Sequence, residues 1–178
     1  MKKIFVKSLA ALLLLTLTLC ALAGCKDSAV PDGMQEVTAG NYGELYHLYV
    51  PETWISQAST GVSGARANTD DSNVAVTLSF PGEELTFEAY WNACCAQYEK
   101  VYTDLQVDAE KCVDTTLGGK NARQYVFSGT LDGVQYKYLQ IFAAKDNTIY
   151  TLTYTATAER FDTHLETVES IRAAFVFA

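Results

Sequence analysis

The sequence predicts an α+β fold, an α-β-α sandwich around a mainly antiparallel sheet of about six or seven strands with two main helices. Short runs rich in β-branched and aromatic residues are joined by turns of a few residues, which are too short for the crossovers that parallel strands need. Two other runs repeat apolar residues every three or four positions, which is typical of amphipathic helices. Helices packed on the faces of such a sheet give a layered α+β fold.

The first three strands are expected over residues 45–50, 61–68 and 74–80. The first is rich in tyrosine and leucine and stops at Pro51, which has no N–H for a ladder hydrogen bond. In the third, valine, leucine and phenylalanine alternate with alanine, threonine and serine. This period of two predicts a strand with one buried face.

The next segment changes to a helical period and predicts a helix over residues 86–105, with Thr86 as its N-cap and Glu88 in its first turn. The expected apolar stripe consists of Phe87, Tyr90, Trp91, Cys94, Tyr98, Val101 and Leu105. A further strand is expected over residues 107–116.

Three strands in series are expected over residues 121–131, 134–143 and 148–157. Asp132-Gly133 joins the first two, and both residue types tolerate the positive φ that a tight hairpin needs. In the third strand, tyrosine and leucine alternate with threonine, so the tyrosine and leucine face is expected to be buried. The apolar period then predicts a C-terminal helix over residues 159–174.

The N-terminus has the composition of a secretory signal peptide. Lysines at positions 2, 3 and 7 precede an uncharged apolar run over residues 9–22, which is too short to span a bilayer comfortably. The run ends in Leu22-Ala23-Gly24-Cys25, which resembles the lipobox of bacterial lipoproteins. The resemblance implies a signal peptide over residues 1–24 and a lipid on Cys25. The alternatives are an uncleaved anchor helix and an ordinary secreted protein with an incidental cysteine.

These segments predict a lipid-proximal tether over residues 25–43 and one α+β domain over residues 44–178, on the extracytoplasmic face of the cell membrane. The whole chain has 13 basic and 21 acidic residues, a net charge of −8. Removal of residues 1–24 leaves 10 basic and 21 acidic residues, a net charge of −11. Because nucleic acid and anionic lipid surfaces would repel such a protein, neither is expected as a partner.

The domain resembles the PsbP-like superfamily. The resemblance rests on Pro51-Glu-Thr-Trp54 after an early strand, on Gly119-Lys-Asn-Ala122 and Ile149-Tyr150-Thr-Leu-Thr-Tyr154 within the meander, and on a closing helix from Phe161 to Phe175. It covers nearly all of residues 44–177 and implies the α-β-α sandwich of photosystem II extrinsic proteins and many bacterial lipoproteins. Members are mostly non-enzymatic binding or assembly proteins. The resemblance transfers no functional residue.

Three cysteines remain in the domain if Cys25 is lipidated. In a compartment that permits oxidation, one disulfide is expected, either Cys95–Cys112 or Cys94–Cys112. The alternative is three reduced cysteines that act as small buried hydrophobic residues. A metal site is not expected, because adjacent thiolates on a helix do not converge easily on one ion.

No catalytic constellation is recognisable in the sequence. His47 and His164 have no local cysteine to form a nucleophile pair. Residues 70–73 lack the ligand spacing of a calcium loop and predict a solvated turn. Gly118-Gly119-Lys120 lacks the spacing of a phosphate-binding loop. We therefore expect neither enzymatic activity nor a metal or cofactor.

Tyrosine is abundant, with 11 residues. Its apolar ring and polar tip suit binding surfaces as well as half-buried sheets. Tyr46, Trp54 and Tyr138 are the candidates for a binding surface. The leading hypothesis is a membrane-anchored lipoprotein that binds a protein partner or assists assembly without catalysis. The alternatives are a small-ligand or cell-wall-glycan binding lipoprotein and a hydrolase whose site is assembled only in three dimensions.

Overall fold

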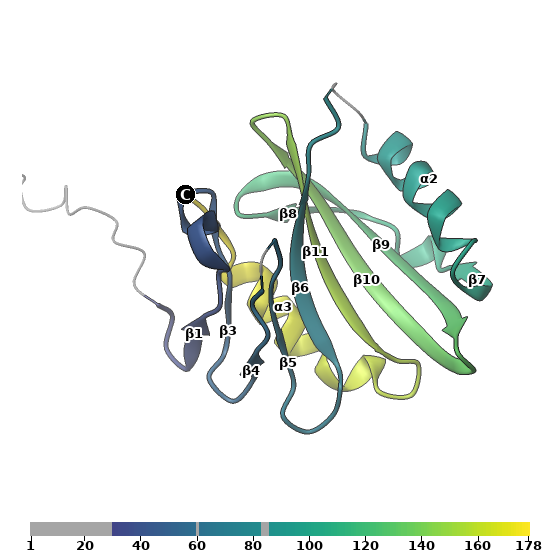
Figure 1. The fold of residues 1–178 in the computed structure, drawn as a ribbon, viewed down its shortest axis with the longest axis horizontal. Coiled ribbons are helices and arrows are strands. Elements are labelled where there is room, and N and C mark those ends of the chain that lie inside the picture. Colours follow the sequence, from purple (N-terminus) through teal and green to yellow (C-terminus); the bar gives the residue numbers. More distant parts are fainter. Residues whose placement is uncertain (1–29, 60, 83–85) are drawn as a thin grey trace, which may run out of the picture.

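The computed structural model describes residues 30–59, 61–82 and 86–178 (Figure 1). The expected signal peptide over residues 1–24 and the expected lipidation site Cys25 therefore lie outside the described residues.

A large antiparallel sheet forms the middle layer of the domain. In spatial order its strands are β4 (Ile55–Ser56), β5 (Ser63–Arg66), β6 (Asn73–Ser79), β11 (Thr148–Thr157), β10 (Val134–Lys145), β9 (Lys120–Leu131) and β7 (Thr103–Val107), with β8 (Asp114–Leu117) also paired to β9. The long strands β9, β10 and β11 form the expected meander, and β6 pairs with β11. The sheet thus has eight strands, one more than the upper expected number.

One long helix lies on each face of the sheet. Helix α2 (Phe87–Tyr98) covers one face near β9, and α3 (Leu165–Ala174) lies on the other, after the short 3-10 helix η3 (Phe161–His164) (Figure 1). The side chain of Thr86 accepts a hydrogen bond from the N–H of Ala89 at 3.1 Å, which is the expected N-cap. The predicted α-β-α sandwich is confirmed.

The domain begins earlier than residue 44. Two small sheets add to the layer that carries α3; they pair β1 (Met34–Glu36) with β3 (Tyr49–Pro51) and β2 (Tyr46–His47) with β12 (Val176–Phe177). The 3-10 helix η1 (Gly40–Glu44) connects β1 to β2. Val37 and Ala39 are buried. The tether expected over residues 25–43 therefore ends before residue 34, because backbone pairing and two small apolar side chains tie residues 34–44 into the fold.

Helix α2 is shorter than predicted, and the strand expected over residues 107–116 is interrupted. The helix ends at Tyr98, and the chain turns back to enter β7, where Asp104 has a φ of 54°. The short helix η2 (Ala109–Lys111) then separates β7 from β8. Both strands pair with β9. Of the six residues between them, Asp108 and Val113 still form backbone hydrogen bonds with β9, and the four residues from Ala109 to Cys112 leave the ladder.

The two faces of the sheet carry different buried clusters. The face under α3 and the N-terminal segment, which we call the closed face, holds the larger cluster, with Val76, Ile141, Leu152, Tyr154 and Ile171 almost without solvent contact. The face under α2 holds a smaller and mainly aromatic cluster: Trp91, Tyr125, Phe127, Tyr138, Phe142 and Ile149. The stability of the fold therefore rests mainly on the closed face, where the larger apolar area is buried.

Candidate functional site

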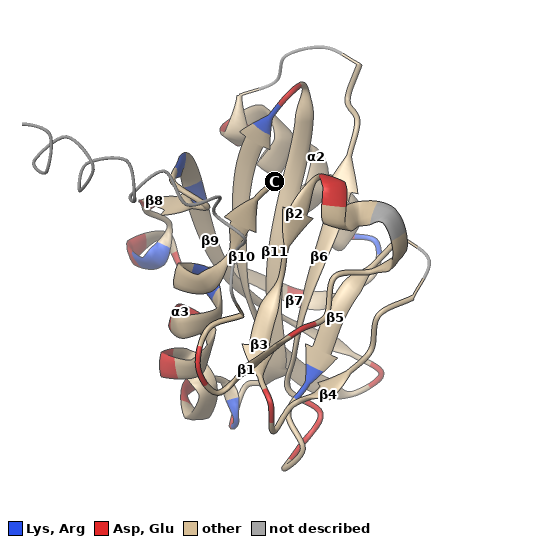
Figure 2. Ribbon diagram, turned by 90° about the vertical axis from the view of Figure 1, so that its left-hand side faces the viewer, with Lys and Arg blue, Asp and Glu red and all other residues tan. Residues whose placement is uncertain are grey.

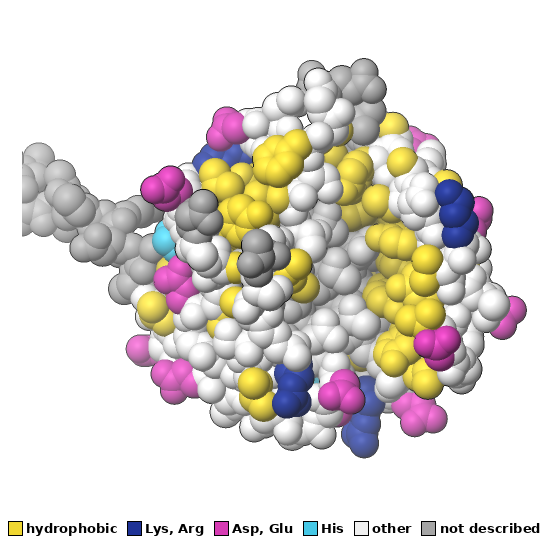
Figure 3. All heavy atoms as spheres, in the orientation of Figure 1, with side chains coloured by type: hydrophobic (Ala, Val, Ile, Leu, Met, Phe, Trp, Pro, Cys, Tyr) yellow, Lys and Arg dark blue, Asp and Glu magenta, His cyan; other side chains and the backbone are white. Residues whose placement is uncertain are grey.

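Part of the face that carries α2 remains uncovered. Its side chains alternate with the buried valines, leucines and tyrosines of β6 and β11, and the strand register places them together. We call this region the open face and define it by Asn73, Ala75, Thr77, Thr151, Thr153, Thr155 and Gln140. Figure 3 shows a hollowed band of polar side chains and backbone between two groups of apolar side chains. Thr77 is exposed and four of the seven residues are half-buried, whereas Thr151 and Gln140 are buried at 5% and 7% exposure, so the accessible part of the open face lies on β6 and the adjacent half of β11.

Four half-buried tyrosines lie beside the open face, three on or just after α2 and one on β10. We call them the tyrosine wall: Tyr90, Tyr98, Tyr102 and Tyr136. The Tyr90 hydroxyl lies 2.7 Å from the Ser79 hydroxyl. The Tyr98 hydroxyl donates to the side-chain carbonyl of Gln140 at 3.0 Å, and the Gln140 amide donates to the Thr153 hydroxyl at 3.2 Å. These bonds connect the wall to the floor of the open face.

The aromatic cluster beneath α2 holds the tyrosine wall in place. The Trp91 ring stacks on Tyr125 with centroids 4.3 Å apart, and Tyr98 stacks on Phe127 at 5.0 Å. Burial raises the pKa of Tyr98 and of Tyr138 far above the ordinary value of a phenol. Tyr98 and Tyr138 therefore present neutral hydroxyl groups rather than charge at neutral pH.

The open face contrasts with the rest of the molecule in its charge. The acidic and basic residues coloured in Figure 2 lie mostly in loops, helices and strand ends, whereas the seven residues of the open face are all uncharged. In a protein with a formal net charge of −8, an uncharged floor favours an uncharged ligand surface.

An exposed phenylalanine follows the last residue of β6, on the side of the strand that carries Val76 and Leu78. Phe80 directly follows Ser79, the partner of Tyr90, and its side chain is 70% exposed. A single exposed apolar side chain is common on protein surfaces and does not by itself mark the binding face.

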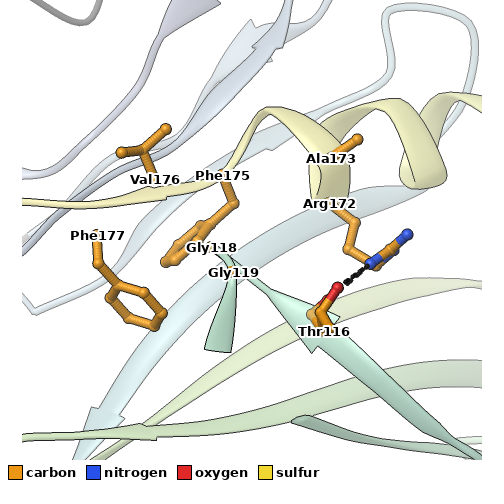
Figure 4. Close-up of a pocket in the computed structure, with 8 residues that line it drawn as sticks. All are labelled: Thr116, Gly118, Gly119, Arg172, Ala173, Phe175, Val176 and Phe177. Carbon is orange, nitrogen blue, oxygen red and sulfur yellow. Dashed lines mark hydrogen bonds between the residues drawn. The ribbon is translucent and has the colours of Figure 1, made fainter. Parts of the chain in front are cut away.

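Figure 4 shows a second candidate, a cavity of about 350 Å³ between the β8–β9 turn and the end of α3. Phe175 and Phe177 form its apolar part and Gly118 and Gly119 its backbone part. Its cation, Arg172, is already used: it bonds both carboxylate oxygens of Glu169 and donates to the Thr116 carbonyl at 2.6 Å. Arg172 holds the pKa of Glu169 below its ordinary range. This arginine ties α3 to β8 and is not free to bind an anion.

A polar cavity of about 400 Å³ lies at the other end of the sheet, lined by β7, β9, β10 and Ala158. Gln106 and Gln135 contribute amides to its lining. Lys137 lies over the ring of Phe161 with its Nζ 4.8 Å from the centroid. Asp108 lies 3.5 Å from Lys111. Both charged groups thus have partners within the protein, as Arg172 does.

The histidines form structural pairs with carboxylates. His47 lies 2.8 Å from Glu36, and His164 lies 3.1 Å from Asp70. The Ser72 N–H donates to Asp70 at 2.8 Å, but Ser72 is only 3% exposed. Ser72, Asp70 and His164 therefore hold the β5–β6 turn against η3 and do not form an accessible nucleophile site.

The three residues expected to form a binding surface are buried instead, so that prediction is wrong. The exposures of Tyr46, Trp54 and Tyr138 are 0%, 6% and 7%. Tyr46 bonds the Ser63 hydroxyl and stacks on Phe175 in the closed-face cluster. Tyr138 lies in the aromatic cluster under the tyrosine wall. Strand alternation could have identified the threonines of the open face, but the sequence does not say which face a helix leaves uncovered.

Cys94, Cys95 and Cys112 are free thiols in the structure, and all three are half-buried. Neither of the two expected disulfides is formed there. Within the described ranges, no group of three histidine, cysteine or acidic side chains is placed to hold a metal ion. None of the described helices is both long and apolar enough to cross a bilayer.

Three solved structures have a similar fold. LpqN of Mycobacterium tuberculosis, described as involved in cell envelope biogenesis, aligns with a TM-score of 0.60 and 14% identity over 82% of this chain and 91% of its own. Cyanobacterial PsbP of Synechocystis aligns with a TM-score of 0.59 and 14% identity, over 88% of this chain and 99% of its own. A protein of unknown function from Pseudomonas aeruginosa, described as a putative regulator, aligns with a TM-score of 0.53 and 15% identity, over 77% of this chain and 92% of its own.

At these identities the likeness concerns the fold, and at that level the PsbP-like resemblance is confirmed. No protein-family model matches the sequence, and no curated protein matches it either.

Proposed function

We propose that this protein is an extracytoplasmic, lipid-anchored module that binds a protein partner at the membrane without catalysis. The N-terminal lipobox pattern supports the location and the anchor at Cys25. The fold supports the kind of role, since LpqN is described as an envelope-biogenesis protein.

The observation that carries the proposal is the tyrosine wall beside the partly uncovered sheet face. Tyrosine and phenylalanine are enriched in protein interfaces, because a ring buries much apolar area with few rotatable bonds. The hydrogen bonds of Tyr90 and Tyr98 hold their rings before a partner arrives, which lowers the entropy cost of binding.

A second candidate ligand is an uncharged cell-wall glycan. The floor of the open face consists mostly of hydroxyl and amide groups, and the tyrosine rings beside it offer flat apolar surfaces. Sugars present the same combination of hydroxyl groups and apolar ring faces. The absence of charge among the seven open-face residues favours this candidate over an ionic ligand.

The test compares two surface variants in cells that carry the lipidated protein. Thr77→Arg adds a bulky charge to the open face, and Ser170→Arg makes the same kind of change on the exposed surface of α3. After chemical crosslinking, we expect one stoichiometric protein partner with the wild type and with Ser170→Arg, and its loss with Thr77→Arg. A Cys25→Ala variant tests whether the anchor is needed for the contact.

The outcomes separate the two ligands. Capture of the same partner by Thr77→Arg would contradict a protein contact on the open face. Retardation of the wild type, but not of Thr77→Arg, in gels that contain soluble cell-wall glycan would favour the second candidate.

A further inference from the structure

The geometry points to a disulfide between Cys95 and Cys112 in the exported protein, with Cys94 left as a thiol in the tyrosine wall. The sequence leaves Cys94 and Cys95 equivalent as partners of Cys112, whereas the structure separates them. The inference rests on the proposed function, because an extracytoplasmic protein meets oxidising partners and a cytosolic one is kept reduced.

Helix α2 runs along β9, and this places Cys95. The Trp91 ring stacks on Tyr125, and two turns later Tyr98 stacks on Phe127. Cys95 lies one turn after Trp91 and one turn before Tyr98, so it sits above the stretch of β9 between the two contacts.

The segment between β7 and β8 reaches the same stretch of β9 from the edge of the sheet. The Asp108 N–H donates to the Val126 carbonyl at 2.9 Å, and the Val113 N–H donates to the Gln124 carbonyl at 3.1 Å. Cys112 lies between these two contacts and packs, like Cys95, against the aromatic cluster. Its thiol contacts the Asp108 carbonyl at 3.3 Å.

An electrostatic effect agrees with this placement. The pKa of Cys95 is raised to about 11, first by burial and then by the negative charges of Cys94, Glu99 and Cys112. Cys95 and Cys112 are thus close enough for a charge on one thiol to act on the other.

Cys94 packs against the same aromatic cluster but points to a different side of α2. Neighbouring residues on a helix are turned by about 100°, and the sulfur of Cys94 interacts with the hydroxyls of Tyr98 and Tyr90. Burial raises the pKa of Cys94, and these two hydrogen bonds offset part of that rise. Its partners belong to the tyrosine wall, not to the segment that carries Cys112.

The bond would form by exchange with an oxidised dithiol protein of the envelope. The Cys112 thiolate attacks the donor's disulfide, which gives a mixed disulfide and releases one donor thiolate. The Cys95 thiolate then attacks the Cys112 sulfur, so the Cys95–Cys112 bond forms and the second donor thiolate leaves. Two electrons pass to the donor, and the protons lost by the two cysteines end on its thiols. The product ties α2, and with it the tyrosine wall, to the edge of the sheet.

The test is a peptide map of the full lipidated chain from envelope fractions. The protein is denatured in acid, alkylated before reduction and digested with trypsin. Cleavage after Lys100 and Lys111 separates the peptide with Cys94 and Cys95 from the one with Cys112. We expect a linked pair of peptides with Cys95 and Cys112 joined and Cys94 alkylated.

Three serine variants complete the test. Cys94→Ser should keep the linked pair, and Cys95→Ser and Cys112→Ser should each lose it. In the wild type and in Cys94→Ser, reduction should lower the melting temperature by about 5–10 °C, because the bond closes a short loop of the unfolded chain. A link between Cys94 and Cys112 in the wild type would overturn the assignment.

The location is measured in the same cells with a membrane-impermeant amine reagent. Three alkylated cysteines in a chain that this reagent reaches would overturn the disulfide and leave the proposed location intact. If the reagent does not reach the chain, the proposed function fails, and the purified protein is incubated with glutathione disulfide instead. Formation of the Cys95–Cys112 link there would support the pairing, and three free thiols would overturn it.

Discussion

The two faces of the sheet differ in the kinds of residues they carry and in how completely these are covered. The closed face is sealed by α3 and the N-terminal segment, and Ile171, Leu152 and Val76 are fully buried there. The face under α2 is only partly covered, and its residues are mainly aromatic or polar, with three cysteines at its edge. Burial on the first face stabilises the fold, while incomplete burial on the second leaves groups that can bind or react. The contrast places most of the buried apolar area on one face and leaves the other available for the recognition that we propose.

The largest effect is expected from a cavity in the closed face. Ile171→Ala removes a fully buried side chain of α3 and should lower the free energy of unfolding by about 2–5 kcal/mol. Urea denaturation measures this free energy of unfolding. The control is Val134→Ala, at a site that is 42% exposed, and its free energy of unfolding should stay within about 0.5 kcal/mol of the wild type. Equal midpoints for the two variants would mean that the closed face does not dominate stability.

A smaller effect is expected at the β8–β9 turn, which packs against β12. Gly118 has a φ of 53°, and a Cβ there would lie 2.6 Å from a ring carbon of Phe177. Gly119 has a φ of 74° and no atom within 4 Å of such a Cβ. Gly118→Ala should therefore cost about 2 kcal/mol or more and Gly119→Ala about 1 kcal/mol, as measured by thermal melts. Equal losses would show that the contact with Phe177 does not matter.

The ion pair that holds the β5–β6 turn to η3 makes stability depend on pH. Burial raises the pKa of Asp70, but hydrogen bonds from Ser72 and His164 outweigh it, and the net pKa lies below its ordinary value. A depressed carboxyl pKa adds stability above the unfolded value near 4, and this is lost as pH falls through the folded value. Asp70→Asn should lower the free energy of unfolding by about 1 kcal/mol at neutral pH. The variant should also lose less stability than the wild type as the pH falls below about 4. If the melting temperature of Asp70→Asn falls with decreasing pH as steeply as that of the wild type, this role is contradicted.

The smallest effect on stability is expected on the open face. Thr77→Arg changes an exposed side chain and should leave the free energy of unfolding within about 0.5 kcal/mol of the wild type. It should abolish partner capture, whereas Ile171→Ala should retain capture below its melting temperature. Loss of capture in proportion to loss of stability would remove the distinction between the two faces.

The period of two in β6 and β11 predicted most of the side chains that face the closed-face core, but Phe80, expected on the buried side, is 70% exposed, and Ile149 and Thr151 are buried on the opposite side. Tyr150, Leu152 and Tyr154 are buried on the closed face as expected. The end of α2 was missed because Leu105 continues the apolar period and reaches the same cluster from β7, whereas Val101 is 56% exposed. The helical spacing of Leu105 therefore could not be distinguished from that of a true helix residue without the tertiary fold.

The site was harder to predict than the fold. Tyr46 and Tyr138 suit a buried strand as well as a surface, and their burial depends on elements distant in the sequence. The open face exists because α2 covers β9 and stops short of β6, which no local pattern encodes. The choice between Cys94 and Cys95 likewise depends on the register of α2 against β9.

The central claim is that the open face is the surface through which the anchored protein meets its partner. It is tested most directly by placing a photoreactive amino acid at Thr77 or at Ser170 of the lipidated protein in living cells. We predict one protein adduct of constant size from position 77 and none from position 170. An adduct from position 170 alone, or none from either position, would contradict the account.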